Sequence, residues 1–165
     1  MRKQKGFSLI ELLIVVAIIL IIAAIAIPNL MRSKIAANEA SAVASTRTLI
    51  TAEATYVSAY PEQGYANTMA QLGPKSGGAT PDSSASGLID NELATATSSG
   101  KLKSGFYYTL GPSGATAPVT QFTLNVQPAS TSVGLRNFFT DETGVIRSAQ
   151  GVSGATASSP ALNAQ

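Results

Sequence analysis

One carboxylate lies inside a segment that is otherwise almost entirely apolar. Glu11 falls near the start of residues 7–27, a run of 21 residues in which Ser8 is the only other polar side chain. An ionised carboxylate at the centre of a bilayer costs about 2.5–3.5 kcal/mol, and charges within membrane segments usually mark a function. The chemistry that Glu11 offers is ionic, because its charge needs a partner in apolar surroundings. The sequence therefore singles out Glu11 as a candidate functional residue.

The residue types that most catalytic and metal sites require are missing. The chain has no cysteine and no histidine, which excludes Cys- or His-based nucleophiles and disfavours zinc, haem and iron–sulfur sites. Oxygen ligands are available, but without the spacing of a calcium-binding EF-hand, at Asp82, Asp90, Glu92, Asp141 and Glu142. No nucleophile motif is recognisable. We therefore expect no enzymatic activity, no cofactor and no metal.

The basic character of the chain belongs to its first six residues. The net charge is +2, but Arg2, Lys3 and Lys5 supply three of the eleven basic side chains. Beyond residue 6 the chain has eight basic and nine acidic side chains, so we expect no nucleic-acid partner. Basic residues beside a membrane segment stay on the cytoplasmic side. The charge pattern thus predicts a cytoplasmic N-terminus and a C-terminal part outside the membrane.

Three interpretations compete for residues 1–27: a cleaved secretory signal, a plain membrane anchor, and an anchor that later forms the core of a helical polymer. A charge within the apolar run weakens the first, and gives the second no benefit. A purely local explanation of Glu11 is a capping box, with Ser8 as N-cap and Glu11 reaching back to the Ser8 amide. That explanation is compatible with the third interpretation.

The sequence GFSLIELLIVVAII at residues 6–19, followed by AAIAIP at residues 23–28, resembles the class III signal of type IV pilins and type II secretion pseudopilins. The resemblance implies that a prepilin peptidase cleaves between Gly6 and Phe7 and that Phe7 is then N-methylated. It also implies that Glu11 pairs with the Phe7 amine of an adjacent subunit. The chain departs from many pilins at Leu20, where they carry glycine, which leaves open whether the helix unwinds upstream of Pro28 in a filament.

The apolar run continues into an amphipathic one. Helical spacing and the absence of glycine up to Gly64 predict a single helix from Phe7 to about Ser58, roughly 78 Å long and bent near Pro28. Residues 7–28 would form its transmembrane or filament-core half and residues 29–58 its amphipathic half. The expected apolar stripe of the second half comprises Ile35, Val43, Leu49, Ile50, Tyr56, Val57 and Tyr60.

The rest of the chain predicts a small head. We expect a connection over residues 59–104, with helical turns at 67–72 and 88–94 around a surface loop at 73–87. Strand patterns predict a sheet over residues 105–149, with strands at 106–110, 119–126, 135–140 and 144–147. Residues 150–165 read as a loose tail. The fold class is therefore α+β: one long N-terminal helix packed on a roughly four-stranded antiparallel sheet, as the resemblance also implies.

These observations favour a filament subunit over an enzyme. The expected protein is a type IV pilin with a cleaved leader at residues 1–6, held in the inner membrane as a precursor and then assembled into an extracellular homopolymer. Its partners would be a prepilin peptidase and an inner-membrane assembly platform. The alternatives are a pseudopilin or minor pilin of a secretion or competence system and, from another class, a membrane-anchored extracytoplasmic binding module.

Overall fold

A computed structural model describes residues 7–112, 117–151 and 154–162. The chain divides into two compact units, one up to Lys34 and one from Ile35 onward. Helix α1, Leu9–Ala59, contributes residues to both units. The expected helix starts two residues earlier, at Phe7. Its last residue, Ala59, agrees with the bias that Pro61 imposes on the residue before it.

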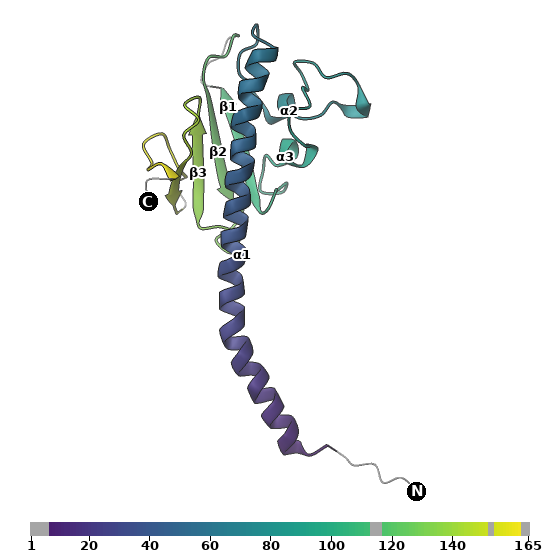
Figure 1. Cartoon of the computed structure of the whole chain (residues 1–165), viewed down its shortest axis with the longest axis vertical. Helices are drawn as coiled ribbons and strands as arrows, with labels where there is room; N and C mark the ends of the chain where they lie inside the picture. The colour runs from purple at the N-terminus through teal and green to yellow at the C-terminus, as the bar shows by residue number, and fades with distance from the viewer. Residues whose placement is uncertain (1–6, 113–116, 152–153, 163–165) are drawn as a thin grey trace. The chain divides into compact units, whose positions relative to one another are not determined.

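The second unit is built around a four-stranded antiparallel sheet (Figure 1). The strands follow one another in sequence order as a meander: β1 (Phe106–Pro112), β2 (Phe122–Pro128), β3 (Arg136–Asp141) and β4 (Arg147–Gln150). The predicted α+β fold class is thereby confirmed. The alternation along β2 is as expected, because Phe122, Leu124 and Val126 are buried and the residues between them are half-buried.

One strand lies later in the sequence than expected. We predicted the last strand at residues 144–147, but β4 begins only at Arg147, which pairs with Phe139. The apolar residues before it lie outside the sheet. Val145 and Ile146 line a hollow together with Ile50 of α1 instead of extending the ladder of β3.

The connection between α1 and the sheet contains three short helical elements: α2 (Met69–Leu72), the 3₁₀ turn η1 (Ser76–Gly78) and α3 (Asn91–Thr95). Helix α2 lies within the helical turn expected at 67–72, and α3 overlaps the one expected at 88–94. Between them the chain is mostly exposed, but backbone hydrogen bonds such as Gly87 N–H to Gly73 O (2.8 Å) close the loop on itself.

The core of the second unit combines one face of α1 with the inner face of the sheet and with α2 and α3. Its largest fully buried side chains are Tyr56, Tyr108, Phe106, Phe138, Leu49, Leu72, Leu93 and Leu124. The face of α1 differs from the expected stripe, because Ile50 and Val57 are only half-buried while Glu39 and Glu53 are buried.

The described part of the C-terminal segment is not loose. Backbone N–H groups of Ser148 and Leu162 donate to Pro160 O (3.1 Å) and Ile146 O (2.8 Å). Arg147 adds a bond from Nη1 to Ser159 O (3.0 Å), and Ala155 is buried. Residues 154–162 are therefore tied to β4, although their composition of small polar residues suggested a free tail.

Candidate functional site

Glu11 is the candidate that sequence alone identified, and it stands in the first turn of α1. Its Oε2 accepts a hydrogen bond from the Ser8 backbone N–H (2.9 Å), and the Leu12 N–H donates to Ser8 O (3.3 Å). The predicted contact between Glu11 and the Ser8 amide is thus present. A carboxylate here also interacts favourably with the N-terminal end of the helix dipole. Both Ser8 and Glu11 are exposed, so the carboxylate remains accessible.

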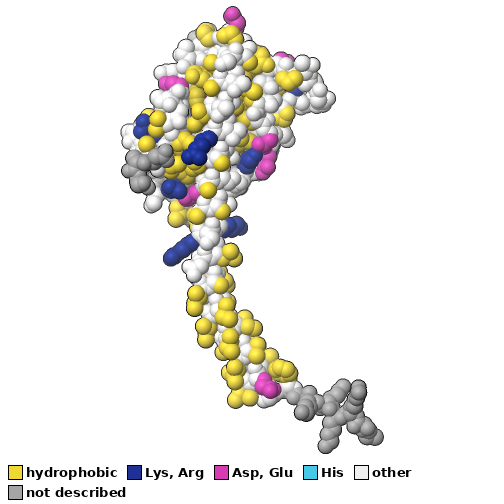
Figure 2. Space-filling view, viewed as in Figure 1, with side chains coloured by type: hydrophobic (Ala, Val, Ile, Leu, Met, Phe, Trp, Pro, Cys, Tyr) yellow, Lys and Arg dark blue, Asp and Glu magenta, His cyan; other side chains and the backbone are white. Residues whose placement is uncertain are grey.

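The residues around Glu11 form an apolar surface without cover. Large apolar side chains from Phe7 (80% exposed) to Met31 are exposed, and Figure 2 shows those on one face of the molecule. Contiguous apolar patches above a few hundred Å² mark interaction or membrane surfaces. By length and composition this helix could cross a membrane, and none of its most apolar stretch is buried. Such a helix requires lipid or protein around it.

Of the other residues singled out by the sequence, some lie outside the described residues and some lie in α1. Gly6 and the rest of the expected leader lie outside the described residues. Pro28 lies within α1, and the helix continues through both Leu20 and Pro28. Because proline has no N–H, the Ala24 carbonyl lacks its usual helical donor. Arg32 and Lys34 follow the apolar stretch and are exposed.

In the second unit, a buried carboxylate joins α1 to the start of β3. Glu39 Oε1 accepts from the backbone N–H groups of Leu135 (2.8 Å) and Arg136 (3.0 Å), and Oε2 accepts from Arg136 Nε (2.8 Å). The neighbouring Asn38 donates from Nδ2 to Val133 O (3.1 Å). The buried carboxylate of Glu39 thus has one guanidinium and two backbone amides as hydrogen-bond donors. These charge-assisted bonds link α1 to the sheet.

A second buried carboxylate has no such partner. Glu53 is fully buried, and its Oε2 accepts from the Ala66 N–H (2.9 Å), while Oε1 has no hydrogen-bond partner among the described residues. Burial raises the pKa of Glu53 from 4.5 to about 7, and the bond from Ala66 opposes that rise. Desolvation favours the neutral acid here.

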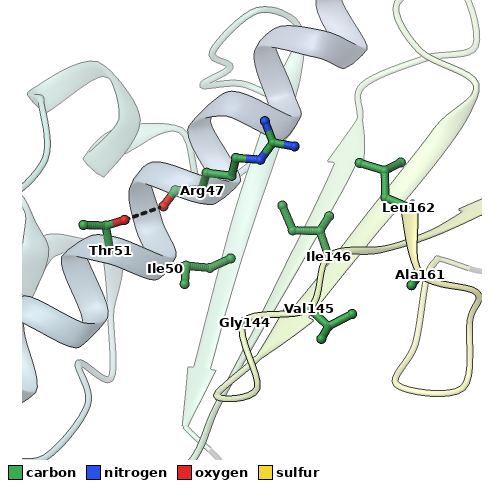
Figure 3. Close-up of a pocket in the computed structure, with 8 residues that line it drawn as sticks. All are labelled: Arg47, Ile50, Thr51, Gly144, Val145, Ile146, Ala161 and Leu162. Atoms are coloured by element: carbon green, nitrogen blue, oxygen red, sulfur yellow. Dashed lines mark hydrogen bonds between the residues drawn. The ribbon is translucent and has the colours of Figure 1, made fainter. Parts of the chain in front are cut away.

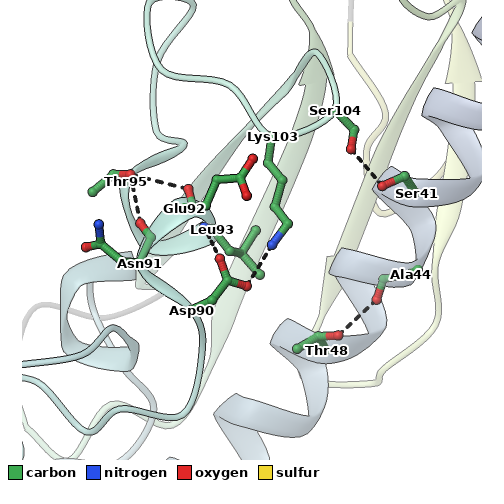
Figure 4. A network of polar contacts seen from close by, with 10 residues as sticks. All are labelled: Ser41, Ala44, Thr48, Asp90, Asn91, Glu92, Leu93, Thr95, Lys103 and Ser104. Carbon is green, nitrogen blue, oxygen red and sulfur yellow. Dashed lines mark hydrogen bonds and ion pairs between the residues drawn. The ribbon is translucent and has the colours of Figure 1, made fainter.

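The acidic residues of the loops are engaged in local contacts. Asp90 caps α3 through the Leu93 N–H (2.8 Å) and pairs with Lys103 (2.6 Å), as Figure 4 shows. The Lys103 bond is the main cause that lowers the pKa of Asp90. Asp82 pairs with Lys75, and that bond is likewise the main cause that lowers the pKa of Asp82. The structure groups no three acidic residues as a metal site within the described ranges.

An open hollow of about 430 Å³ lies between α1 and the C-terminal part of the second unit (Figure 3). Ile50, Val145, Ile146 and Leu162 give it apolar walls, and Arg47 brings the one charged side chain of its lining. Its lining, as far as the structure describes it, contains no Asp, Glu or Lys side chain.

Sequence reasoning missed Glu39 and Glu53. Both fall on the helical face that carries Ala42, Val43, Leu49 and Tyr56, so their spacing was the available signal. A stripe defined by apolar residues alone leaves them out.

The comparisons with known proteins give one family model, which matches the N-terminal segment, and two curated relatives. Residues 1–27 match the family model described as the prokaryotic N-terminal methylation motif. The type IV wide pilus major component PilA4 of Thermus thermophilus is 62% identical over 39 residues, which cover 24% of this chain and 30% of that protein. The type IV major pilin protein PilA of Myxococcus xanthus is 45% identical over 56 residues, or 34% of this chain and 26% of that protein. No solved structure matches the chain significantly. The matches therefore span less than a third of the length of these relatives.

Proposed function

We propose that the chain is a structural subunit of a type IV pilus, cleaved after Gly6 and polymerised through its N-terminal helix, on the support of its methylation motif and its similarity to two pilins. Glu11 carries the proposal, because it is the one charged group in residues 9–31 of α1, where the large apolar side chains are exposed. A major pilin is the preferred role. A pseudopilin or minor pilin of a secretion or competence system is the second candidate.

The local geometry suits a contact between subunits. Only Oε2 of Glu11 has a hydrogen-bond partner among the described residues, the Ser8 N–H. Cleavage after Gly6 would create a charged amine on Phe7, and N-methylation keeps it charged. In apolar surroundings two unpaired charges are each costly, whereas a close pair compensates part of that cost. Processing would therefore create the partner that Glu11 of a neighbouring copy requires.

The same reasoning orders the steps of assembly. The precursor would lie in the inner membrane through residues 7–28, with Arg2, Lys3 and Lys5 in the cytoplasm and the second unit outside. A prepilin peptidase would remove residues 1–6, and an inner-membrane platform would extract the subunit into the filament. There the apolar helices of neighbouring copies replace lipid. We place the bend of α1 at Pro28, where one helical hydrogen bond is missing.

The first test is mass spectrometry of filaments sheared from cells that produce the protein. We expect abundant chains that begin with N-methylated Phe7. Processed chains found only in the membrane fraction would favour the pseudopilin or minor pilin instead. Chains that keep residues 1–6 in every fraction would contradict the proposal and support an anchored binding module.

Two substitutions of Glu11 separate the charge from the cap. Glu11→Gln keeps an oxygen that can accept from the Ser8 N–H, whereas Glu11→Val removes it. Because leaving one charge of a buried pair unpaired costs about 3–5 kcal/mol, we expect both variants to insert into the membrane yet give at least tenfold fewer filaments. Glu62→Gln, at an exposed position of the second unit, is the matched control. Normal filament yield from Glu11→Gln would show that capping, not charge pairing, is the role of this residue.

A further inference from the structure

The buried carboxyl of Glu53 joins α1 to the segment that follows the helix. It projects from α1, and it receives the N–H of Ala66 from the segment that follows the helix (2.9 Å). Its second oxygen is buried without a hydrogen-bond partner among the described residues. The ion pairs found in those residues are Lys75–Asp82, Lys103–Asp90 and Arg136–Glu39, so none of them neutralises Glu53.

The groups facing Glu53 do not supply a positive charge. Tyr56, one turn further along α1, donates from its hydroxyl to Ser83 O (2.6 Å) and accepts from Gln71 Nε2 (3.3 Å). The ring of Tyr60 lies 5.0 Å from that of Tyr56, and Asp82 in the following loop is already paired with Lys75. Ionisation of Glu53 would therefore place an uncompensated charge among tyrosines and apolar side chains, which is strongly unfavourable.

The segment held by Glu53 is packed as well as hydrogen-bonded. Ala66, Met69 and Leu72 are buried in the core, and Tyr65 stacks on Phe122 of β2 with ring centres 4.9 Å apart. With the segment docked, Glu53 is fully buried and accepts the Ala66 N–H. Docking of this segment and the protonation of Glu53 are therefore linked.

We propose that Glu53 and residues 60–72 form a pH-sensitive latch, in which the protonated carboxyl keeps the segment docked on α1 and the ionised carboxyl promotes its release. Release would expose the core side chains of α2 and loosen the loop that Tyr56 and Gln71 hold. The latch is a property of the second unit, and it is independent of whether the chain assembles into a pilus.

The direction of the effect follows from the two states of the carboxyl. In the docked state the pKa of Glu53 is about 7, and in the released state it returns toward 4.5. Below pH 4.5 the acid is neutral in both states and docking is strongest. Between these values the released state has lost its proton and the docked state has kept it, so the equilibrium for release rises about tenfold per pH unit. Above about pH 7 the effect levels off, after a total change on the order of a hundredfold.

The test uses the full chain in detergent micelles. The side-chain carboxyl carbon of Glu53 is followed by NMR against pH, and the hydrogen-exchange protection of the Ala66 amide is measured at pH 5, 6, 7 and 8 with correction for intrinsic exchange. We expect the carbon to titrate near pH 7 and the protection to fall on the order of a hundredfold from pH 5 to pH 8. Glu53→Gln, which keeps an acceptor for Ala66, should remove most of that dependence.

Glu62→Gln is the matched control, because it removes an exposed carboxylate near the same segment and should leave the pH dependence unchanged. A carboxyl carbon of Glu53 that titrates near pH 4.5 would overturn the latch. So would protection of Ala66 that stays constant with pH while Glu53 titrates near 7. Because both readouts are made on the unsubstituted chain, they decide the question even if Glu53→Gln fails to fold.

Discussion

Glu39 and Glu53 are both buried on the same face of α1, yet they differ in the number of groups that bond to the carboxylate. Glu39 has two backbone N–H donors and the Arg136 guanidinium, so the structure accommodates its charge. Glu53 has one backbone donor and an unpartnered oxygen, so its neutral form is favoured. Two identical residues on one helix therefore differ in their partners, since Glu39 has a cation beside it and Glu53 has none in the described residues.

The contribution of Glu39 to the stability of the second unit can be tested by substitution. In Glu39→Gln the carboxylate is lost, and an amide NH₂ group faces either the donor of Arg136 or the two backbone N–H groups. We expect the second unit to lose about 2 kcal/mol of stability, the usual worth of a hydrogen bond to a charged group. All five tyrosines lie beyond residue 35, so tyrosine fluorescence during urea unfolding reports on this unit.

Glu92→Gln is the matched control for that measurement. Glu92 is exposed and its side chain has no hydrogen bond in the described structure, so we expect a change within about 0.5 kcal/mol. Equal stabilities of Glu39→Gln and the unsubstituted chain would show that the bonds of Glu39 to residues 135 and 136 do not stabilise the second unit.

At the scale of elements, α1 has one sequence pattern on each side of the boundary at residue 34. Up to Met31 the helix is apolar except at Glu11 and Asn29, and beyond residue 34 the buried face is shared by small, apolar and acidic residues. On the exposed side of the second part, Thr48, Thr51 and Thr55 donate their hydroxyls to backbone carbonyls four residues earlier (2.8–3.2 Å). One continuous element thereby presents an unpartnered surface in one unit and packs a core in the other.

The segment after α1 depends on a close approach at Gly64. Gly64 has φ +76°, and a Cβ added there would lie 2.1 Å from the Val119 carbonyl oxygen. This approach allows the bonds from Tyr65 N–H to Val119 O (2.9 Å) and from Val119 N–H to Gln63 O (2.9 Å). We expect Gly64→Ala to destabilise the second unit by about 3 kcal/mol or more, because left-handed strain and overpacking add.

Gly77→Ala separates those two causes. Gly77 also has a positive φ (+73°), but a Cβ there would meet no atom within 4 Å. We therefore expect only the conformational cost of about 1–2 kcal/mol, measured by the same urea unfolding. If both variants lose the same stability, the contact with Val119 is not the cause.

At the scale of the whole molecule, the two units have different requirements. The cluster of buried apolar side chains in the described residues begins at Ala42, so the second unit has its own core. The apolar helix of the first unit has no protein cover. In the described residues, the second unit thus buries a cluster of apolar side chains, whereas the first leaves its apolar side chains exposed.

This division predicts the behaviour of a fragment of residues 35–165. We expect it to be folded and monomeric without detergent, with circular dichroism showing helix and strand and light scattering giving the mass of one chain. The full chain without detergent should associate, because its exposed apolar surface is large. An unfolded or aggregated fragment would show that the second unit depends on the first.

The sequence by itself determined the N-terminal segment and the fold class. Residues 7–27 are apolar at almost every position, so their need for apolar surroundings does not depend on any fold. The contact of Glu11 with Ser8 spans three residues and follows from helix geometry alone. The strands β1 to β3 were predictable to within a few residues because alternation is local.

Only the tertiary structure decided the roles of the buried glutamates and of the C-terminal segment. The partners of Glu39 lie 96 and 97 residues away, and no local pattern encodes that pairing. Val145 and Ile146 looked like a strand, but they line the hollow beside α1 and β4 begins only at Arg147. Residues 154–162 looked like a tail because small polar residues have no strong preference of their own, and the free edge of β4 supplied the hydrogen bonds that fix them.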